Sequence, residues 1–95
     1  MTLEEFKKST ETESEPTVEM NKALQSLWWD KKGDWAKSHN IVQDIHDSYG
    51  SWIHAYLHRK EGDDLNAKYW YEKAGRPYPT VNLIEEWDLI TQNLL

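Results

Sequence analysis

One stretch decides the fold of this 95-residue chain: residues 54–71, which read HAYLHRKEGDDLNAKYWY. Helical spacing places His54, His58 and Glu61 on one face of the first half. Gly62 interrupts that helix, and either of the two aspartates that follow can cap a second helix with three consecutive aromatic residues. The stretch therefore predicts a helical hairpin whose first helix carries more polar chemistry than simple packing requires.

The same plan occurs upstream, where residues 28–35 read WWDKKGDW. An aromatic-bearing helix ends in charged residues, a Gly-Asp turn follows, and a second aromatic-bearing helix begins. Gly33 lies 29 residues before Gly62. A helix–turn–helix unit that recurs at such a period is typical of solenoid-like folds.

Apolar spacing and turn residues extend this pattern to five predicted helices. The first begins after Thr17 and stops at Gly33, and the second follows Asp34 and stops at Gly50. The third follows Ser51 and stops at Gly62, and the fourth follows Asp63 or Asp64 and stops at Gly75. The fifth carries Leu83, Trp87, Ile90 and Leu94.

The second hairpin resembles a tetratricopeptide repeat, whose pattern reads W-x2-L-G-x2-Y, then A-x3-F, then P. Ala67 and Tyr71 match the A-x3-F step, Ala74 supplies the next small residue, and Pro79 stands at the terminal proline. The first hairpin is a weaker copy, so the resemblance covers residues 22–79. It implies an all-α fold of two tetratricopeptide-like hairpins, and we expect the fifth helix to act as a C-terminal capping helix.

Two features depart from that family. His54 and His58 stand where the repeat has packing side chains, and the 29-residue period is shorter than the family's 34, which favours a closed bundle over a regular superhelix. The whole chain also resembles a group of small bacterial proteins of uncharacterised function that share a His-Ala-Tyr-Leu-His-Arg-like core and a Tyr-Trp-Tyr helix. That resemblance implies the same fold and no particular activity.

Charge and composition argue against some classes of binding partner and predict where the protein is located. The net charge is −6, and six glutamates against two lysines place −4 of it in residues 1–20. Residues 9–17 are almost entirely polar, so we expect residues 1–17 to be a disordered acidic leader before a helical repeat-like domain at 18–95. An acidic chain without a basic stripe argues against nucleic acid and polybasic membrane attachment. With no cysteine and no long apolar run, we expect a cytoplasmic protein that does not enter membranes.

The polar residues around the second hairpin predict a cleft for a ligand or partner. Its candidate members are His54, His58, Arg59, Glu61, Asn66 and Tyr69. In one interpretation Glu61 and Asp63 hold Arg59 or Arg76 in a structural network; in the other the same groups bind a small polar ligand or transfer protons. No nucleophile motif or phosphate-binding loop accompanies them. The leading hypothesis is therefore a non-enzymatic protein-interaction module with no catalytic residues and no cofactor.

The alternative hypothesis is a small metal-binding protein or enzyme that uses His54, His58 and Glu61. Histidines at i and i+4 can present two ligands to one metal ion, Glu61 follows one turn later, and His39 or His46 could join from the preceding helix. The His-Glu-x-x-His arrangement of many metalloproteases is absent. A histidine satisfied within a helix–helix seam explains His54 equally well.

An open groove and a covered face remain as alternatives for the aromatic surface. A groove for an acidic peptide would be lined by Tyr49, Trp52, Tyr56, Arg59 and Lys60. The covered alternative places the C-terminal helix, with Trp87, over Trp52 and Tyr56. A homodimer that buries aromatic surface is a third hypothesis.

Overall fold

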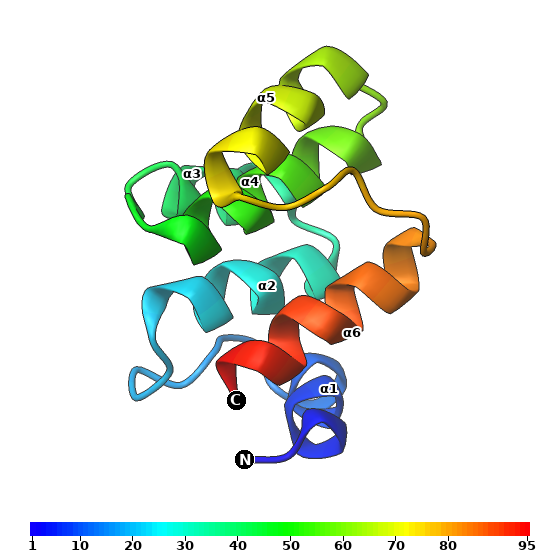
Figure 1. Ribbon diagram of the computed structural model, residues 1–95. Helices are drawn as coiled ribbons and strands as arrows, with labels where there is room; N and C mark the ends of the chain where they lie inside the picture. Colours follow the sequence, from blue (N-terminus) through cyan, green and yellow to red (C-terminus); the bar gives the residue numbers. More distant parts are fainter.

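The computed structural model describes residues 1–95 and consists of six α-helices with no β-strand (Figure 1). The prediction of an all-α fold is confirmed, with one helix more than expected. No helix has both the length and the apolar character needed to cross a membrane. The helices are α1 (Leu3–Thr12), α2 (Lys22–Lys32), α3 (Trp35–Val42), α4 (Ser48–Lys60), α5 (Asp64–Ala74) and α6 (Leu83–Leu94).

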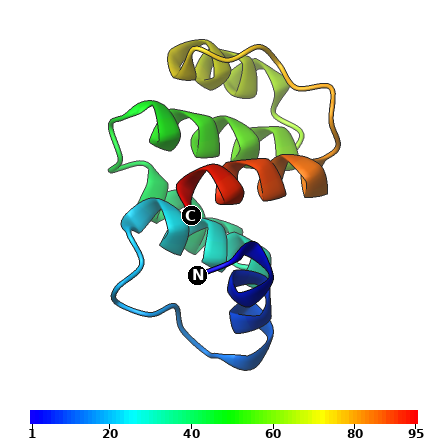
Figure 2. The ribbon, with the colours of Figure 1, turned by 60° about the horizontal axis from the view of Figure 1, so that its bottom comes forward.

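The helices pack as two hairpins joined by α6. In sequence order α2 packs on α3 and α4 packs on α5, while α6 lies against both α2 and α4 (Figure 2). At the end of the molecule away from α5, α1 contacts α2 and α6, and the two chain termini lie close together (Figures 1 and 2). The result measures 35 × 25 × 21 Å along its principal axes.

The Gly-Asp turns form as the sequence predicts. Gly62 has a φ of 86°, a left-handed conformation in which a side chain would be strained. Asp63 then caps α5, because its Oδ1 accepts a hydrogen bond from the backbone N–H of Asn66 at 3.3 Å. The equivalent residue of the first hairpin, Asp34, caps α3 in the same way. Local turn chemistry therefore defines both hairpins.

The predicted boundary at Gly50 is wrong. α3 ends at Val42, α4 begins at Ser48, and Gly50 lies within the first turn of α4. A Cβ atom at Gly50 would lie 2.1 Å from the carbonyl oxygen of Ile45. This glycine is therefore needed for the close approach of the α3–α4 loop to α4, and Asp47 in place of Ser51 is the N-cap residue.

The prediction that residues 1–17 form a disordered leader is also corrected, because residues 3–12 form α1. Thr2 and Glu5 make a capping box at its start, and Phe6 is fully buried with its ring 5.8 Å from that of Trp87. Lys32 of α2 holds the other end of α1, where its Nζ donates to the carbonyl oxygens of Thr10 and Glu13. The buried ring of Phe6 and these tertiary hydrogen bonds help to dock α1, whose Leu3 also packs against the core.

No helix covers the connection from Glu13 to Asn21, so the first helix of the hairpins begins later than the predicted start after Thr17. Asn21 sets the observed start, since its Oδ1 accepts from the N–H of Leu24 at 2.8 Å.

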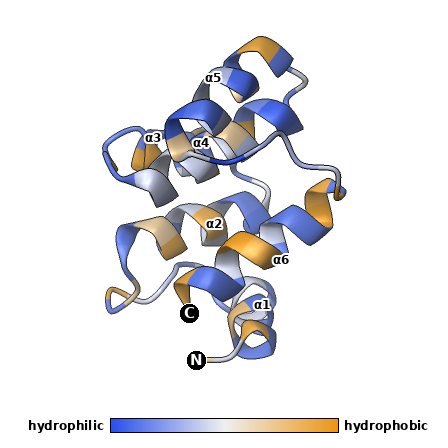
Figure 3. Ribbon diagram, viewed as in Figure 1, coloured by the Kyte–Doolittle hydropathy of each residue, from blue (hydrophilic) through white to orange (hydrophobic).

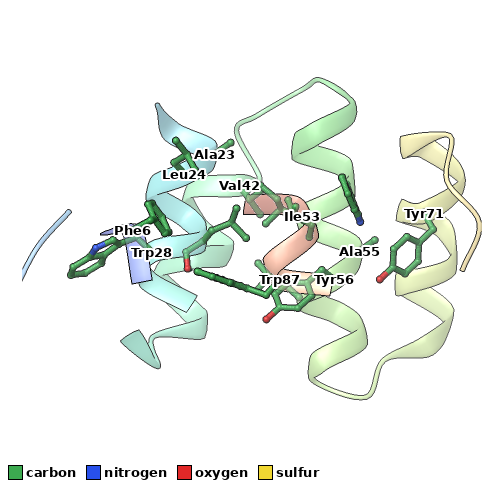
Figure 4. Close-up of a cluster of buried hydrophobic side chains, with 14 of the residues drawn as sticks. Phe6, Ala23, Leu24, Trp28, Val42, Ile53, Ala55, Tyr56, Tyr71 and Trp87 are labelled. Carbon is green, nitrogen blue, oxygen red and sulfur yellow. The ribbon is translucent and has the colours of Figure 1, made fainter. Parts of the chain in front are cut away.

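A single hydrophobic core connects all six helices. Bands of hydrophobic and hydrophilic residues alternate along α6, as expected for an amphipathic helix (Figure 3). The core side chains meet between α2, α4 and α6, and Trp87 also donates from its Nε1 to the carbonyl oxygen of Leu27 at 3.1 Å. The buried hydrophobic residues of this core, many of them visible in Figure 4, are Phe6, Met20, Ala23, Leu24, Leu27, Trp28, Val42, Trp52, Ile53, Ala55, Tyr56, Leu57, Ala67, Tyr71, Trp87 and Ile90.

The aromatic face of α4 is covered and does not form an open groove. Trp52 and Tyr56 are only 5% and 3% exposed. Trp52 donates from its Nε1 to Glu86 of α6 at 3.2 Å, and Tyr56 donates to Asp30 of α2 at 2.7 Å. The covered alternative is therefore confirmed, with Trp52 held by α6 and Tyr56 held by α2.

Candidate functional site

Two histidines of α4 form the base of the candidate site. His54 and His58 are one turn apart, and their imidazole rings stack with centroids 4.9 Å apart. His54 is buried, with 7% of its surface exposed, whereas His58 is partly exposed. The helix therefore presents one inner and one outer imidazole along the same face.

His39 of α3 completes a group of three histidines. Its Nε2 lies 3.0 Å from Nε2 of His54, and its ring centroid is 5.4 Å from that of His58. Each histidine offers a ring nitrogen within 4.8 Å of the nitrogens offered by the other two. Tetrahedral Zn²⁺ sites with bonds of about 2.0–2.1 Å require nitrogens about 3.3 Å apart. The nitrogens of His39 and His54, 3.0 Å apart, already lie near that spacing.

Two tryptophans hold the outer faces of these imidazoles. Trp35 stacks on His39 at 4.8 Å with an interplanar angle of 9°, and Trp70 of α5 stacks on His54 at 3.9 Å and 14°. Trp35 is itself fixed to α4, because its Nε1 donates to the carbonyl oxygen of Leu57 at 2.9 Å. The stacked tryptophan and histidine rings therefore come from α3, α4 and α5, and both packing and hydrogen bonds orient them.

A carboxylate orients the third histidine. Glu61 places its Oε1 2.7 Å from Nδ1 of His58. A proton on Nδ1 makes this hydrogen bond and leaves Nε2 of His58 as the nitrogen with a free lone pair. Metal-binding histidines are commonly oriented by such a carboxylate on the opposite ring nitrogen.

The surroundings favour neutral imidazoles. Burial, followed by the positive charge of His39 and His58 when protonated, lowers the pKa of His54 to about 4. Burial also lowers the pKa of His39, and His58 acts in the same direction while Glu61 opposes it. Because a metal ion binds the deprotonated nitrogen, these shifts would leave both nitrogens available to a metal ion at neutral pH.

The remaining predicted residues divide into different environments. Arg59 turns away from the histidines and donates to Oε1 of Glu86 at 2.7 Å and to the carbonyl oxygen of Val81 at 2.6 Å. The predicted pairing of Arg59 with Glu61 or Asp63 is therefore wrong. Glu86 is 1% exposed and also accepts from Tyr71 at 2.5 Å, so this is a structural network.

Asn66 and Tyr69 lie beside the histidines without joining them. Asn66 donates from its side chain to Asp63 at 2.7 Å and so reinforces the start of α5. Tyr69 is 53% exposed, and its ring meets the edge of Trp70 at 5.2 Å. The six residues predicted as one cleft thus separate into a histidine site, a helix cap, an exposed ring and a buried ion pair.

The sequence left open whether His39 or His46 joins His54 and His58, and the structure decides between them. His39 joins the site, whereas His46 is exposed in the loop after α3. Glu61, predicted as a direct ligand, contacts the ring of His58, and a second group of possible donors comprises His58, Glu61 and Asp63. The spacing Trp35-x3-His39 carried a signal for this arrangement, because i and i+4 residues share a helix face.

Comparison of this chain with protein families, with curated proteins and with solved structures finds no match.

Proposed function

We propose that this protein binds one divalent transition-metal ion, of which Zn²⁺ is the best fit, through His39, His54 and His58. The observation that carries the proposal is the convergence of three imidazole nitrogens, from two separate helices, within 4.8 Å of one another. Imidazole ligands suit Zn²⁺, Cu²⁺ and Ni²⁺ and are poor ligands for Mg²⁺ and Ca²⁺, which prefer oxygen.

The surroundings of the three histidines support this function. The hydrogen bond between Glu61 and His58 orients one ligand, and the stacking of Trp35 and Trp70 restricts the other two. Lowered pKa values at His39 and His54 remove the competition with protons near neutral pH. A packed seam of neutral imidazoles alone would not require the carboxylate on the outermost ring.

The interaction-module hypothesis rests on the fold. We propose that the α2–α3 and α4–α5 pairs are tetratricopeptide-like hairpins and that α6 caps them; the contacts of α6 with α2 and α4 support this arrangement. The groove that would receive a peptide is, however, closed, since Trp52 and Tyr56 are buried and hydrogen-bonded to α6 and α2 respectively. The metal site is consequently the better-supported function.

Metal titration of the purified protein tests the proposal. The protein is purified without a polyhistidine tag, stripped with chelator and titrated with Zn²⁺ by calorimetry, and bound metal is counted after dialysis. We expect one ion per chain, and binding that stabilises the folded state by about 2.7 kcal/mol at a free metal concentration 100 times the dissociation constant.

Histidine variants supply the controls. His39→Ala and His58→Ala alter partly exposed residues, and each should abolish stoichiometric binding. His46→Ala removes an exposed histidine outside the group and should bind like wild type. The proposal fails if wild type takes up no metal, or if the site variants bind as well as His46→Ala while retaining wild-type circular dichroism.

A further inference from the structure

We infer that the metal centre keeps a fourth coordination position for an exchangeable ligand, a water molecule that small anions displace. This inference rests on the proposed metal-binding function. The number of protein ligands decides what a bound zinc ion can do. Structural sites have four protein ligands, whereas sites with three protein ligands bind water or substrate at the fourth position.

The protein offers too few donors at the three histidines to fill all four positions of a tetrahedral ion. At the group of three histidines only three donors converge, and neither Glu61 nor Asp63 lies close enough to all three to complete the set. Glu61 is engaged with Nδ1 of His58 at 2.7 Å. Asp63 accepts from the backbone and the side chain of Asn66, at 3.3 and 2.7 Å, where it caps α5. Either carboxylate would have to leave these partners to become the fourth ligand.

The three histidines lie where the helix packing meets solvent. Trp35 and Trp70 stack on His39 and His54 and offer ring faces, which are not metal ligands. His54 is buried, but His39 and His58 are partly exposed, so an ion held by all three lies at the outer edge of the helix packing. Its remaining position then faces solvent.

The charge of the ligands gives the expected chemistry. Three neutral imidazoles leave the full charge of +2 on the ion, whereas thiolate ligands would neutralise it. Such an ion acidifies its bound water and attracts small anions. The structure thus assigns to this site a Lewis-acid centre that takes monodentate anionic ligands.

Replacement of Zn²⁺ by Co²⁺ makes the fourth ligand visible. One equivalent of Co²⁺ is added to the chelator-stripped protein, and its visible absorption is recorded while azide is added. Perchlorate, which coordinates metals poorly, serves as the ionic-strength control. We expect a saturable, one-site change of the Co²⁺ spectrum with azide and no change with perchlorate.

Variants distinguish an open position from one filled by a carboxylate. Asp63→Asn should bind Co²⁺ and keep the azide response, and Glu61→Gln, which binds metal more weakly, should keep that response at saturating Co²⁺. A wild-type spectrum that is insensitive to azide, with a response gained in Glu61→Gln or Asp63→Asn, would show that a carboxylate is the fourth ligand and overturn the inference. One bound Co²⁺ with no azide response in any of the proteins also overturns it but leaves the metal site intact, whereas failure to bind Co²⁺ or Zn²⁺ removes both proposals.

Discussion

Acidification of the metal-free protein should destabilise the fold through His54. In the folded state His54 is buried beside two other imidazoles, which lowers its pKa to about 4 from an ordinary value of 6.5. Between these two values the unfolded chain binds a proton at this residue and the folded chain does not. Stability therefore rises with pH in this window, and the contribution of His54 is complete above pH 6.5.

The magnitude follows from the width of the window. Each unit of pKa difference corresponds to about 1.4 kcal/mol, so a fall from pH 7 to pH 4 should remove about 3 kcal/mol of unfolding free energy through His54. The lowered pKa of His39 adds a further loss in the same direction. This is a large fraction of the roughly 5–15 kcal/mol typical of a small domain.

Urea unfolding followed by tryptophan fluorescence, at a series of pH values with chelator present, measures this loss. His54→Phe is the matched variant, because it removes the titrating group and preserves a ring to stack on Trp70. Carboxylates titrate in both proteins, so their contribution cancels in the difference. The wild type should lose about 3 kcal/mol more than His54→Phe between pH 7 and pH 4. Parallel pH profiles for the two proteins would refute the assigned role of His54.

Four further predictions test the site, the fold and the buried network. Glu61→Gln should weaken Zn²⁺ binding about 10–100-fold in calorimetry, since the oriented hydrogen bond to His58 is impaired. Phe6→Ala should cost about 3 kcal/mol in urea unfolding and increase hydrogen exchange selectively in α1. Gly50→Ala should destabilise by about 1–3 kcal/mol, because its new methyl meets a backbone carbonyl, and a gain in melting temperature would contradict this. Glu86→Gln should cost roughly 3 kcal/mol in urea unfolding by leaving the charge of Arg59 without its partner, and an unchanged urea midpoint would count against that pairing.

Local chemistry determined the predictable part of the fold. Gly62 and Asp63 end one helix and begin the next through backbone conformation and a side-chain hydrogen bond within four residues. The i, i+4 spacing of His54 and His58 likewise placed both imidazoles on one helix face, where their rings stack at 4.9 Å. Such signals are complete within a short segment, so they can be interpreted without knowing what packs against it.

Tertiary packing decided the rest. Phe6 lies in a mostly polar segment, and its contact with the Trp87 ring, 81 residues further along the chain, is one that no local pattern specifies. The partner of Arg59 proved to be Glu86, on a helix whose register against α4 no local pattern specifies.

The choice of His39 over His46 has the same origin. Both residues fall within the second predicted helix, but α3 ends at Val42, which leaves His46 in the following loop and His39 facing α4. By itself the sequence determined that the chain forms helical hairpins with two imidazoles on one face. The third imidazole meets the other two only because side-chain packing sets the positions of α3, α4 and α5, which local sequence rules do not contain.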